Sequence, residues 1–421
     1  EKPALPTDEA VLASCADSAA RSMRARRLAG LREVRPALRR PRAVVHLDCT
    51  AVYADDLLAP WYEQLLASTG PLELFDAHTH IGVNDPDTFK CTAEELLAAL
   101  EPTGSRAVVF PMHEPAGYPP ANDHVLAAAA ASDGRLVAFC RVNPREDPVA
   151  EVRRCIAAGA RGIKLHPRAE QFDLDEPGVR AIVAEAHEQR LPVLIHAGRG
   201  IPALGAHVLE LAAQFPQARF ILAHAGVCDL AWLWRGLDAH PNVFFDTAWF
   251  SAPDLLVLFT HVAPGRILYA TDIPFGSPVH GSLLTFRCAL QAGLTREQIA
   301  CVAGGQVERL LYGEDAVDVG PAPGPGRLRV DPLLLRVSYF LTMALTATIG
   351  GADGAELADL ARLACLVGDD APQAPVCRSI LELLELDPGL EVGKTLPERF
   401  RRLHALVTAN VLALTPDVPV A

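Results

Sequence analysis

Two histidines separated by a single residue, His78 and His80, stand just after the apolar run Leu72 to Phe75. Alternate residues of a β-strand point to the same face, so the two imidazoles can bind one metal ion. Two hydrogen-bonded core histidines would show the same spacing, and the motif alone is weak evidence. The hypothesis of a metal site therefore depends on polar residues further along the chain.

Further polar residues that suit a metal site each come at the end of an apolar, strand-like run: Lys164, His196, His224 and Asp272. Neutral imidazoles and a carboxylate suit zinc, with manganese or iron as alternatives. A metal ion with an open coordination position lowers the pKa of its water to about 7. Asp272 can bind the metal and also accept the proton of that water. Taken singly, each residue can be a core residue or a helix cap, but the coincidence of the whole set favours a divalent-metal site.

Two arginines are candidates for binding the substrate. Arg141 ends the third strand-like run and Arg199 comes after the fifth, so both can face the metal. Together with Lys164 they would suit a substrate carboxylate, which arginine binds in bidentate fashion. Pairing of Arg141 with a nearby acidic residue is the alternative. His166 shares the face of Lys164 and can be structural, contact the substrate or bind the metal. Other ring side chains in loops can line an apolar pocket or serve packing: His113, Trp249, Phe250 and Phe275.

Eight short apolar runs alternate with helical patterns from residue 72 onward, which is typical of βα units. The expected strands are 72–80, 106–112, 136–142, 162–167, 192–198, 219–226, 242–248 and 267–274. Thr92 and Glu95 fit a capping box ahead of one intervening helix. Eight parallel strands with crossover helices predict an α/β fold, a (β/α)8 TIM barrel, which needs roughly 250 residues. A doubly wound open sheet is the alternative, but no glycine-rich phosphate loop comes after any strand.

The barrel is expected over residues 72–313, between two additional regions. Residues 1–71 form an N-terminal extension that we expect to be mostly helical, with a possible strand at 43–47. Residues 314–330 are a linker rich in proline and glycine. Residues 331–421 form an all-helical C-terminal region, with helices after the cap Asp331, over 355–366, and after the caps Thr395 and Glu398. This region either packs on the barrel or forms a subunit contact in a homo-oligomer.

The composition excludes several classes of partner. Half of the 421 residues are apolar, which permits a large core, and the net charge of −13 argues against nucleic acid or an anionic membrane as the main partner. The ten cysteines show no paired pattern, which is typical of buried thiols in a reducing compartment. The apolar stretch Leu333 to Ile349 is short for a membrane span and contains Arg336. We therefore expect a cytoplasmic protein that acts on a small molecule.

Several motifs together resemble the amidohydrolase superfamily, and most closely its amidohydrolase-2 branch of metal-dependent TIM-barrel hydrolases and decarboxylases. The resemblance covers about residues 72 to 313 and includes the closing segment Gly304 to Leu311. The motifs that carry it are Asp76-Ala77-His78-Thr79-His80, Gly162 to Pro167 with Gln171, Ile195-His196-Ala197-Gly198, Leu222 to Gly226, Phe245-Asp246-Thr247 and Ala270-Thr271-Asp272.

The resemblance implies roles for the candidate residues. The first metal ion would be bound by His78, His80, His196 and Asp272. His224 would either bind a second ion or polarise the substrate. Lys164 would be carbamylated and bridge two ions, or stay an amine that binds an anionic substrate. Asp246 would orient a ligand histidine.

The residues and the resemblance support three hypotheses of function. The leading one is a metal-dependent hydrolase acting on an amide, lactone or ester of a small carboxylate-bearing molecule. In it Asp272 is the general base and acid, and His224 or a metal stabilises the oxyanion. The alternative is a metal-dependent non-oxidative decarboxylase of an aromatic or unsaturated acid. A barrel without catalysis that binds partners through its helical region is the third hypothesis, and the complete ligand set argues against it.

Overall fold

The computed structural model describes residues 53–86, 89–198, 200–386 and 399–420. Three expectations fall outside these residues: the strand at 43–47, the helix cap formed by Thr395 and Glu398, and the position of Arg199. The segment Leu47–Ala421 forms one compact unit by itself.

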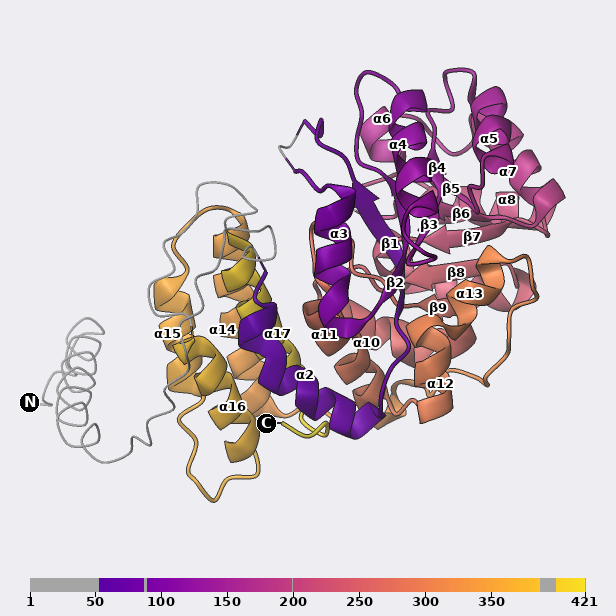
Figure 1. Cartoon of the computed structure of the whole chain (residues 1–421). Helices are drawn as coiled ribbons and strands as arrows, with labels where there is room; N and C mark the ends of the chain where they lie inside the picture. The colour runs from indigo at the N-terminus through magenta and orange to yellow at the C-terminus, as the bar shows by residue number, and fades with distance from the viewer. Residues whose placement is uncertain (1–52, 87–88, 199, 387–398, 421) are drawn as a thin grey trace, which may run out of the picture. The chain divides into compact units, whose positions relative to one another are not determined.

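The expected eight-stranded parallel barrel is confirmed in the described part of the chain (Figure 1). Its strands are β1 (Phe75–Ile81), β2 (Arg106–Pro111), β3 (Leu136–Ala138), β4 (Cys140–Arg141), β5 (Ile163–Leu165), β6 (Pro192–Ile195), β7 (Arg219–Leu222), β8 (Val243–Asp246) and β9 (Ile267–Leu268). The segments β3 and β4 are one barrel strand interrupted at Phe139, whose N–H still donates to the Val109 carbonyl at 2.9 Å. The barrel closes where the N–H of Ala77 donates to the Tyr269 carbonyl, also at 2.9 Å.

The strands are apolar on both faces because both faces are covered. Phe110, Phe139 and Phe244 fill the barrel interior with other buried side chains, whereas a larger core lies between the strands and the outer helices. Such burial on both sides is typical of parallel sheets and explains the continuous apolar runs in the sequence. Most strands are shorter than their apolar runs, because the residues beyond the ladder turn into the loops that carry the polar side chains.

The helices around the barrel begin at the expected signals. Thr92 Oγ1 accepts from the N–H of Glu95 at 3.2 Å, and Glu95 Oε2 accepts from the N–H of Thr92 at 2.7 Å, which confirms the capping box. The helices are α3 (Ala93–Leu100), α4 (Pro119–Ala130), α5 (Pro148–Ala157), α6 (Pro167–Glu170), α7 (Pro177–Gln189), α8 (Leu204–Gln214), α9 (Leu230–Leu233), α10 (Ala252–His261), α11 (Pro278–Ala292), α12 (Arg296–Ala300) and α13 (Gln306–Leu311).

Helices outside the barrel form a separate layer that packs on α10 and α11. They are α2 (Asp55–Thr69), α14 (Pro332–Ile349), α15 (Ala355–Ala364), α16 (Ala374–Glu385) and α17 (Phe400–Leu414). Asp331 caps α14 as expected, accepting from the N–H groups of Leu333 and Leu334 at 2.9 and 3.1 Å. Helix α16 was not among the helices expected from the sequence. Of the two expected placements of the helical region, the structure shows packing on the barrel.

Helix α17 is tied to the barrel by a buried arginine. Arg287 of α11 donates from Nε to Thr415 Oγ1 at 3.0 Å and from its terminal nitrogens to the carbonyls of Thr415, Val418 and Pro419. One helix among the described residues, α14, is long and apolar enough to cross a membrane, a test that core helices also pass. In this fold α14 packs against α15 and α17.

Candidate metal centre

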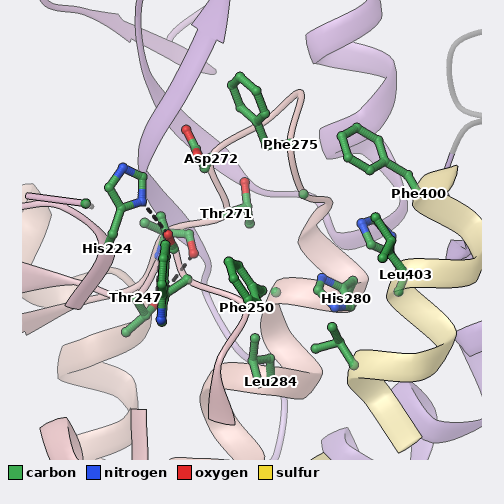
Figure 2. Close-up of a pocket in the computed structure, with 18 of the residues that line it drawn as sticks. His224, Thr247, Phe250, Thr271, Asp272, Phe275, His280, Leu284, Phe400 and Leu403 are labelled. Atoms are coloured by element: carbon green, nitrogen blue, oxygen red, sulfur yellow. Dashed lines mark hydrogen bonds between the residues drawn. The ribbon is translucent and has the colours of Figure 1, made fainter. Parts of the chain in front are cut away.

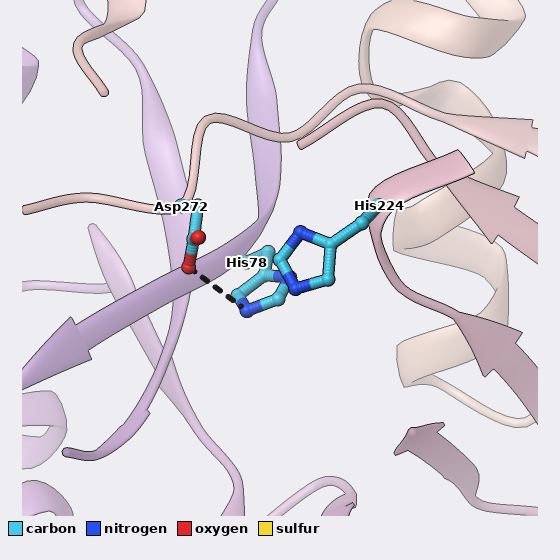
Figure 3. A group of neighbouring side chains, drawn as sticks. All are labelled: His78, His224 and Asp272. Carbon is cyan, nitrogen blue, oxygen red and sulfur yellow. Dashed lines mark ion pairs between the residues drawn. The ribbon is translucent and has the colours of Figure 1, made fainter. Parts of the chain in front are cut away.

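The residues expected at the metal site lie together at the C-terminal ends of the barrel strands. His78 and His80 stand on β1 and Lys164 on β5, while three residues come after strands: His196 after β6, His224 after β7 and Asp272 after β9. All six line one cavity. Figure 3 shows His78, His224 and Asp272 turned toward a common point. Parallel strands present their carboxyl ends at the same rim, which is why side chains distant in the sequence converge here.

The closest contacts join β1 to the loop after β9. Asp272 Oδ1 lies 3.0 Å from His80 Nε2 and 3.2 Å from His78 Nε2, and the two Nε2 atoms are 3.2 Å apart. Lys164 Nζ lies 3.2 Å from His78 Nε2. Donor atoms bound to one zinc ion at about 2.1 Å are themselves about 3 Å apart. The separations and the chemistry of the donors therefore fit a divalent cation.

The remaining two histidines form a second contact. His224 Nε2 lies 2.9 Å from His196 Nδ1. One ligand atom each of His78, His224 and Asp272 lies within 4.8 Å of the others. His196 is thus held next to His224.

Hydrogen bonds orient the histidines. His224 Nδ1 lies 2.7 Å from the Ala248 carbonyl, which can only accept, so Nδ1 carries the proton and Nε2 keeps its lone pair. His78 Nδ1 lies 2.8 Å from Asp246 Oδ2, which directs His78 Nε2 into the site in the same way. Asp246 Oδ1 also accepts from the N–H groups of His224 and Ala248 at 2.8 and 3.0 Å. Asp246 therefore supports two candidate ligands at once.

Asp76 is a second supporting carboxylate, and the sequence analysis gave it no role. It is fully buried and accepts from the N–H groups of His78 and Thr271 at 2.9 and 3.1 Å and from the Thr271 hydroxyl. It thereby joins the start of β1 to the loop that carries Asp272. Its place directly before Ala77 and His78 was the only sequence signal for this role.

The backbone is strained at two of the candidate ligands. His224 has φ = 58° and Asp272 has φ = 62°, and neither is a glycine. These φ values lie in the left-handed region, where a non-glycine residue costs on the order of 1–3 kcal/mol of conformational energy. Such residues are common at functional sites. The Asp272 side chain is 19% exposed, against 1% for His78.

Burial governs the protonation of the site. It lowers the pKa of His78, His80, His196 and His224, which favours neutral imidazoles that can bind a metal. Burial also lowers the pKa of the Lys164 amine to about 7, although Asp272 opposes the shift. The pKa of Asp272 rises to about 6 for the same reason.

Arg141 is paired with an acidic residue, as the alternative interpretation had it. Its Nη2 and Nε donate to Glu170 Oε1 at 2.6 and 3.2 Å, and its Nη1 donates to the Pro111 carbonyl. His166 caps α6 by accepting from the N–H of Ala169 at 3.1 Å, and its ring stacks on His196 with centroids 3.8 Å apart. Both side chains line the metal cavity, and Arg199 lies outside the described residues.

A second cavity of about 370 Å³ adjoins the candidate ligands. It starts at His224 and Asp272 and runs toward α14 and α17 (Figure 2). Trp249, Phe250 and Phe275 line it, as one of the two interpretations of these loop residues expected. The residues of α17 in its wall lie on a helix face that the sequence shows to be apolar, but nothing local indicates that this face will cover the barrel rim.

Comparison with known proteins gives one family and several similar folds. The family model described as Amidohydrolase matches residues 75–311. A 4-oxalomesaconate hydratase from Rhodopseudomonas palustris is 18% identical, with TM-score 0.43 over 57% of this chain and 96% of its own. A probable 2-pyrone-4,6-dicarboxylic acid hydrolase from Acinetobacter baumannii is 15% identical, with TM-score 0.43 over 57% and 99%. A 5-carboxyvanillate decarboxylase from Novosphingobium aromaticivorans with bound manganese is 15% identical, with TM-score 0.46 over 58% and 98%. No curated protein matches the sequence.

Proposed function

The chain belongs to the amidohydrolase family, and from this premise we propose that it is a metal-dependent hydrolase. Its substrate would be an amide, lactone or ester of a small molecule that carries a carboxylate. The observation that carries the proposal is the convergence of His78 Nε2, His80 Nε2 and Asp272 Oδ1 within 3.0–3.2 Å of one another. Lone pairs held this close repel one another unless a proton or a cation lies between them.

Within this proposal His78, His80 and Asp272 hold a divalent cation, most simply zinc, with manganese or iron as alternatives. The bound cation would supply Lewis acidity and lower the pKa of a water molecule. Asp272 would take the proton from that water, because its carboxylate is partly exposed and can accept a proton at the rim of the site. The same carboxyl group would then return the proton to the leaving group.

The tautomer of His224 bears on its proposed role. Because Nδ1 donates to the Ala248 carbonyl, Nε2 presents a lone pair and has no proton to donate to a substrate oxygen. This supports His224 as a metal ligand over His224 as the group that polarises the substrate. The oxyanion would then be stabilised by the cation and not by this imidazole.

Lys164 keeps two alternative roles in the proposal. Its buried amine has a pKa of about 7, so a neutral fraction exists that can react with carbon dioxide to form a carbamate bridging two ions. As an amine near Asp272 it can instead bind an anionic substrate. The two roles differ in the number of metal ions per chain.

The metal content of protein purified without chelators tests the proposal. We expect two equivalents in the wild type that fall in Lys164→Ala if the lysine bridges two ions, and one equivalent in both proteins if it contacts the substrate. Lys90→Ala, which removes an exposed lysine, is the matched control. A wild type that binds no divalent metal would contradict the proposal.

A non-oxidative decarboxylase of an aromatic or unsaturated acid is the second candidate function. The observation that favours it is the aromatic lining of the adjoining cavity by Trp249, Phe250 and Phe275. Release of carbon dioxide from an aromatic acid, without hydrolysis of esters or lactones, would favour the decarboxylase over the hydrolase.

The family acts on small molecules. From the composition alone we propose a cytoplasmic location and no nucleic-acid or membrane partner.

A further inference from the structure

The cavity beside the metal centre has two walls of different origin. The barrel supplies His224, Asp272 and Phe275, whereas α14 and α17 supply Leu345, Ile349, Phe400, Leu403 and Val407. Figure 2 shows His224 and Asp272 on one side, Phe400 and Leu403 on the other, and Phe250, His280 and Leu284 between them. The family match ends at residue 311, so the second wall comes from a part of the chain that lies beyond it.

Two stacked histidines that are not among the candidate metal ligands also line this cavity. His280 in the first turn of α11 and His404 on α17 have ring centroids 4.1 Å apart and planes within 8° of each other. Both are buried, with 6% and 3% exposed. Among the described residues, His280 Nε2 makes no hydrogen bond. The ring nitrogens of His404 have no partner at good hydrogen-bonding geometry, and the backbone of Phe275 approaches them only as a weak hydrogen-bond partner that raises the pKa of this imidazole.

Buried ring nitrogens without hydrogen bonds are rare, because each loses its hydration on burial and gains no hydrogen bond that compensates for it. Here both histidine side chains line a cavity that adjoins the candidate catalytic groups, and a turn of either ring would bring a nitrogen that is now covered within reach of a ligand atom. Burial lowers the pKa of both imidazoles, to about 4 for His280, so both are neutral at neutral pH. A neutral imidazole offers one donor and one acceptor, which suits a hydroxyl or carbonyl oxygen better than a carboxylate.

We propose that α14 and α17 form the distal half of the substrate cavity, and that the His280–His404 pair binds an uncharged oxygen substituent of an aromatic substrate. Phe250, Phe275 and Phe400 would enclose the aromatic ring, and the other end of the molecule would reach Asp272. A cavity of about 370 Å³ is in the range that takes a molecule of one or two rings. The proposal rests on the proposed function only for the end that meets the metal.

The alternative is that the histidines only pack. His404 also stacks on Tyr53 and Phe400, with centroids 5.8 Å away in both cases, so a ring is needed at this position for packing. Phenylalanine keeps the ring and removes both nitrogens. The substitution His404→Phe therefore separates binding by the nitrogens from stacking.

The test is isothermal titration of zinc-loaded protein with matched pairs of probes that differ in one hydroxyl. The pairs are 4-hydroxycinnamate with cinnamate, 6-hydroxy-2-naphthoate with 2-naphthoate, and 4′-hydroxybiphenyl-4-carboxylate with biphenyl-4-carboxylate. We expect the wild type to prefer the hydroxylated member of at least one pair by about 3- to 10-fold. In His404→Phe and His280→Phe this preference should fall below about 2-fold, with the affinity for the unhydroxylated member unchanged.

Two further variants complete the experiment. His404→Gln keeps a donor and an acceptor and should retain part of the preference, whereas His124→Phe alters an exposed histidine on α4 and should change nothing. No preference in the wild type at any probe length, or a preference that survives both phenylalanine variants, would overturn the proposal. Repeating the titration on metal-free protein separates the two proposals: a protein that binds no metal but still prefers the hydroxyl refutes the function and supports the pair.

Discussion

At the scale of single residues, two buried carboxylates that are not candidate ligands orient the histidines that are. Asp246 accepts from the ring of His78 and from the backbone of His224, so one buried side chain sets the direction of two candidate ligands. Asp76 accepts in the same way from the backbone of β1 and of Thr271. Partners of this kind tune metal affinity through the orientation and basicity of the histidine.

We expect Asp246→Asn to weaken metal binding by about 10- to 100-fold, because a neutral amide is a poorer acceptor for His78 Nδ1. Competition with a chromogenic chelator measures the dissociation constant directly. Asp238→Asn, which changes an exposed carboxylate, is the control and should leave that constant unchanged. An unaltered affinity in Asp246→Asn would mean that His78 keeps its direction without this contact.

At the scale of elements, the barrel rim is completed by a helix from the end of the chain. Helix α17 packs on α10 and α11, and its C-terminal end is held by Arg287, which is only 1% exposed. The guanidinium donates to the Thr415 hydroxyl and to three backbone carbonyls. Arg287, in the second half of α11, thereby ties this helix to the C-terminal end of α17, and the first halves of both helices line the cavity.

Arg287→Met should lower the free energy of unfolding by about 2–4 kcal/mol, because buried carbonyls would lose their charged donor. Urea denaturation followed by circular dichroism measures this loss. Arg296→Met removes an exposed arginine on α12 and should stay within about 0.5 kcal/mol of the wild type. Equal stability of the two variants would show that the carbonyls find other donors.

At the scale of the whole molecule, histidines buried in neutral form couple stability to pH. His280 has a pKa of about 4 in the folded chain, below its ordinary value of 6.5, because burial penalises the charged imidazole. The unfolded chain therefore binds a proton between these two values that the folded chain does not. The contribution of neutral His280 to the free energy of unfolding is therefore fully present above pH 6.5 and is lost as the pH falls toward 4.

For His280 this loss amounts to about 2 kcal/mol at pH 5. We expect His280→Phe to lose about that much less stability than the wild type when metal-free protein is moved from pH 7.5 to pH 5. Urea midpoints and slopes at the two pH values give the comparison, and the exposed His124→Phe serves as reference. An equal loss in His280→Phe would place the acid sensitivity in the other buried histidines.

Local patterns along the chain were enough to predict the barrel and most of the residues at its rim. Apolar runs of strand length alternate with helical patterns that begin at caps such as Thr92 and Asp331. These patterns reflect local propensity and burial, which can be predicted from the sequence without knowing the fold. Because parallel strands end at one rim, the polar residues after them had to converge. This is why six residues could be grouped before their distances were known: His78, His80, Lys164, His196, His224 and Asp272.

Contacts between segments that are distant along the chain could not be predicted from local patterns. The bond of Asp246 to His78, the pairing of Arg141 with Glu170 and the stack of His280 on His404 each join residues separated by a long stretch of chain. Helix periodicity predicts that α17 has an apolar face, but it does not say which surface that face will cover. That choice depends on shape and burial summed over the whole fold, and it brings a helix beyond the family match into the wall of the cavity.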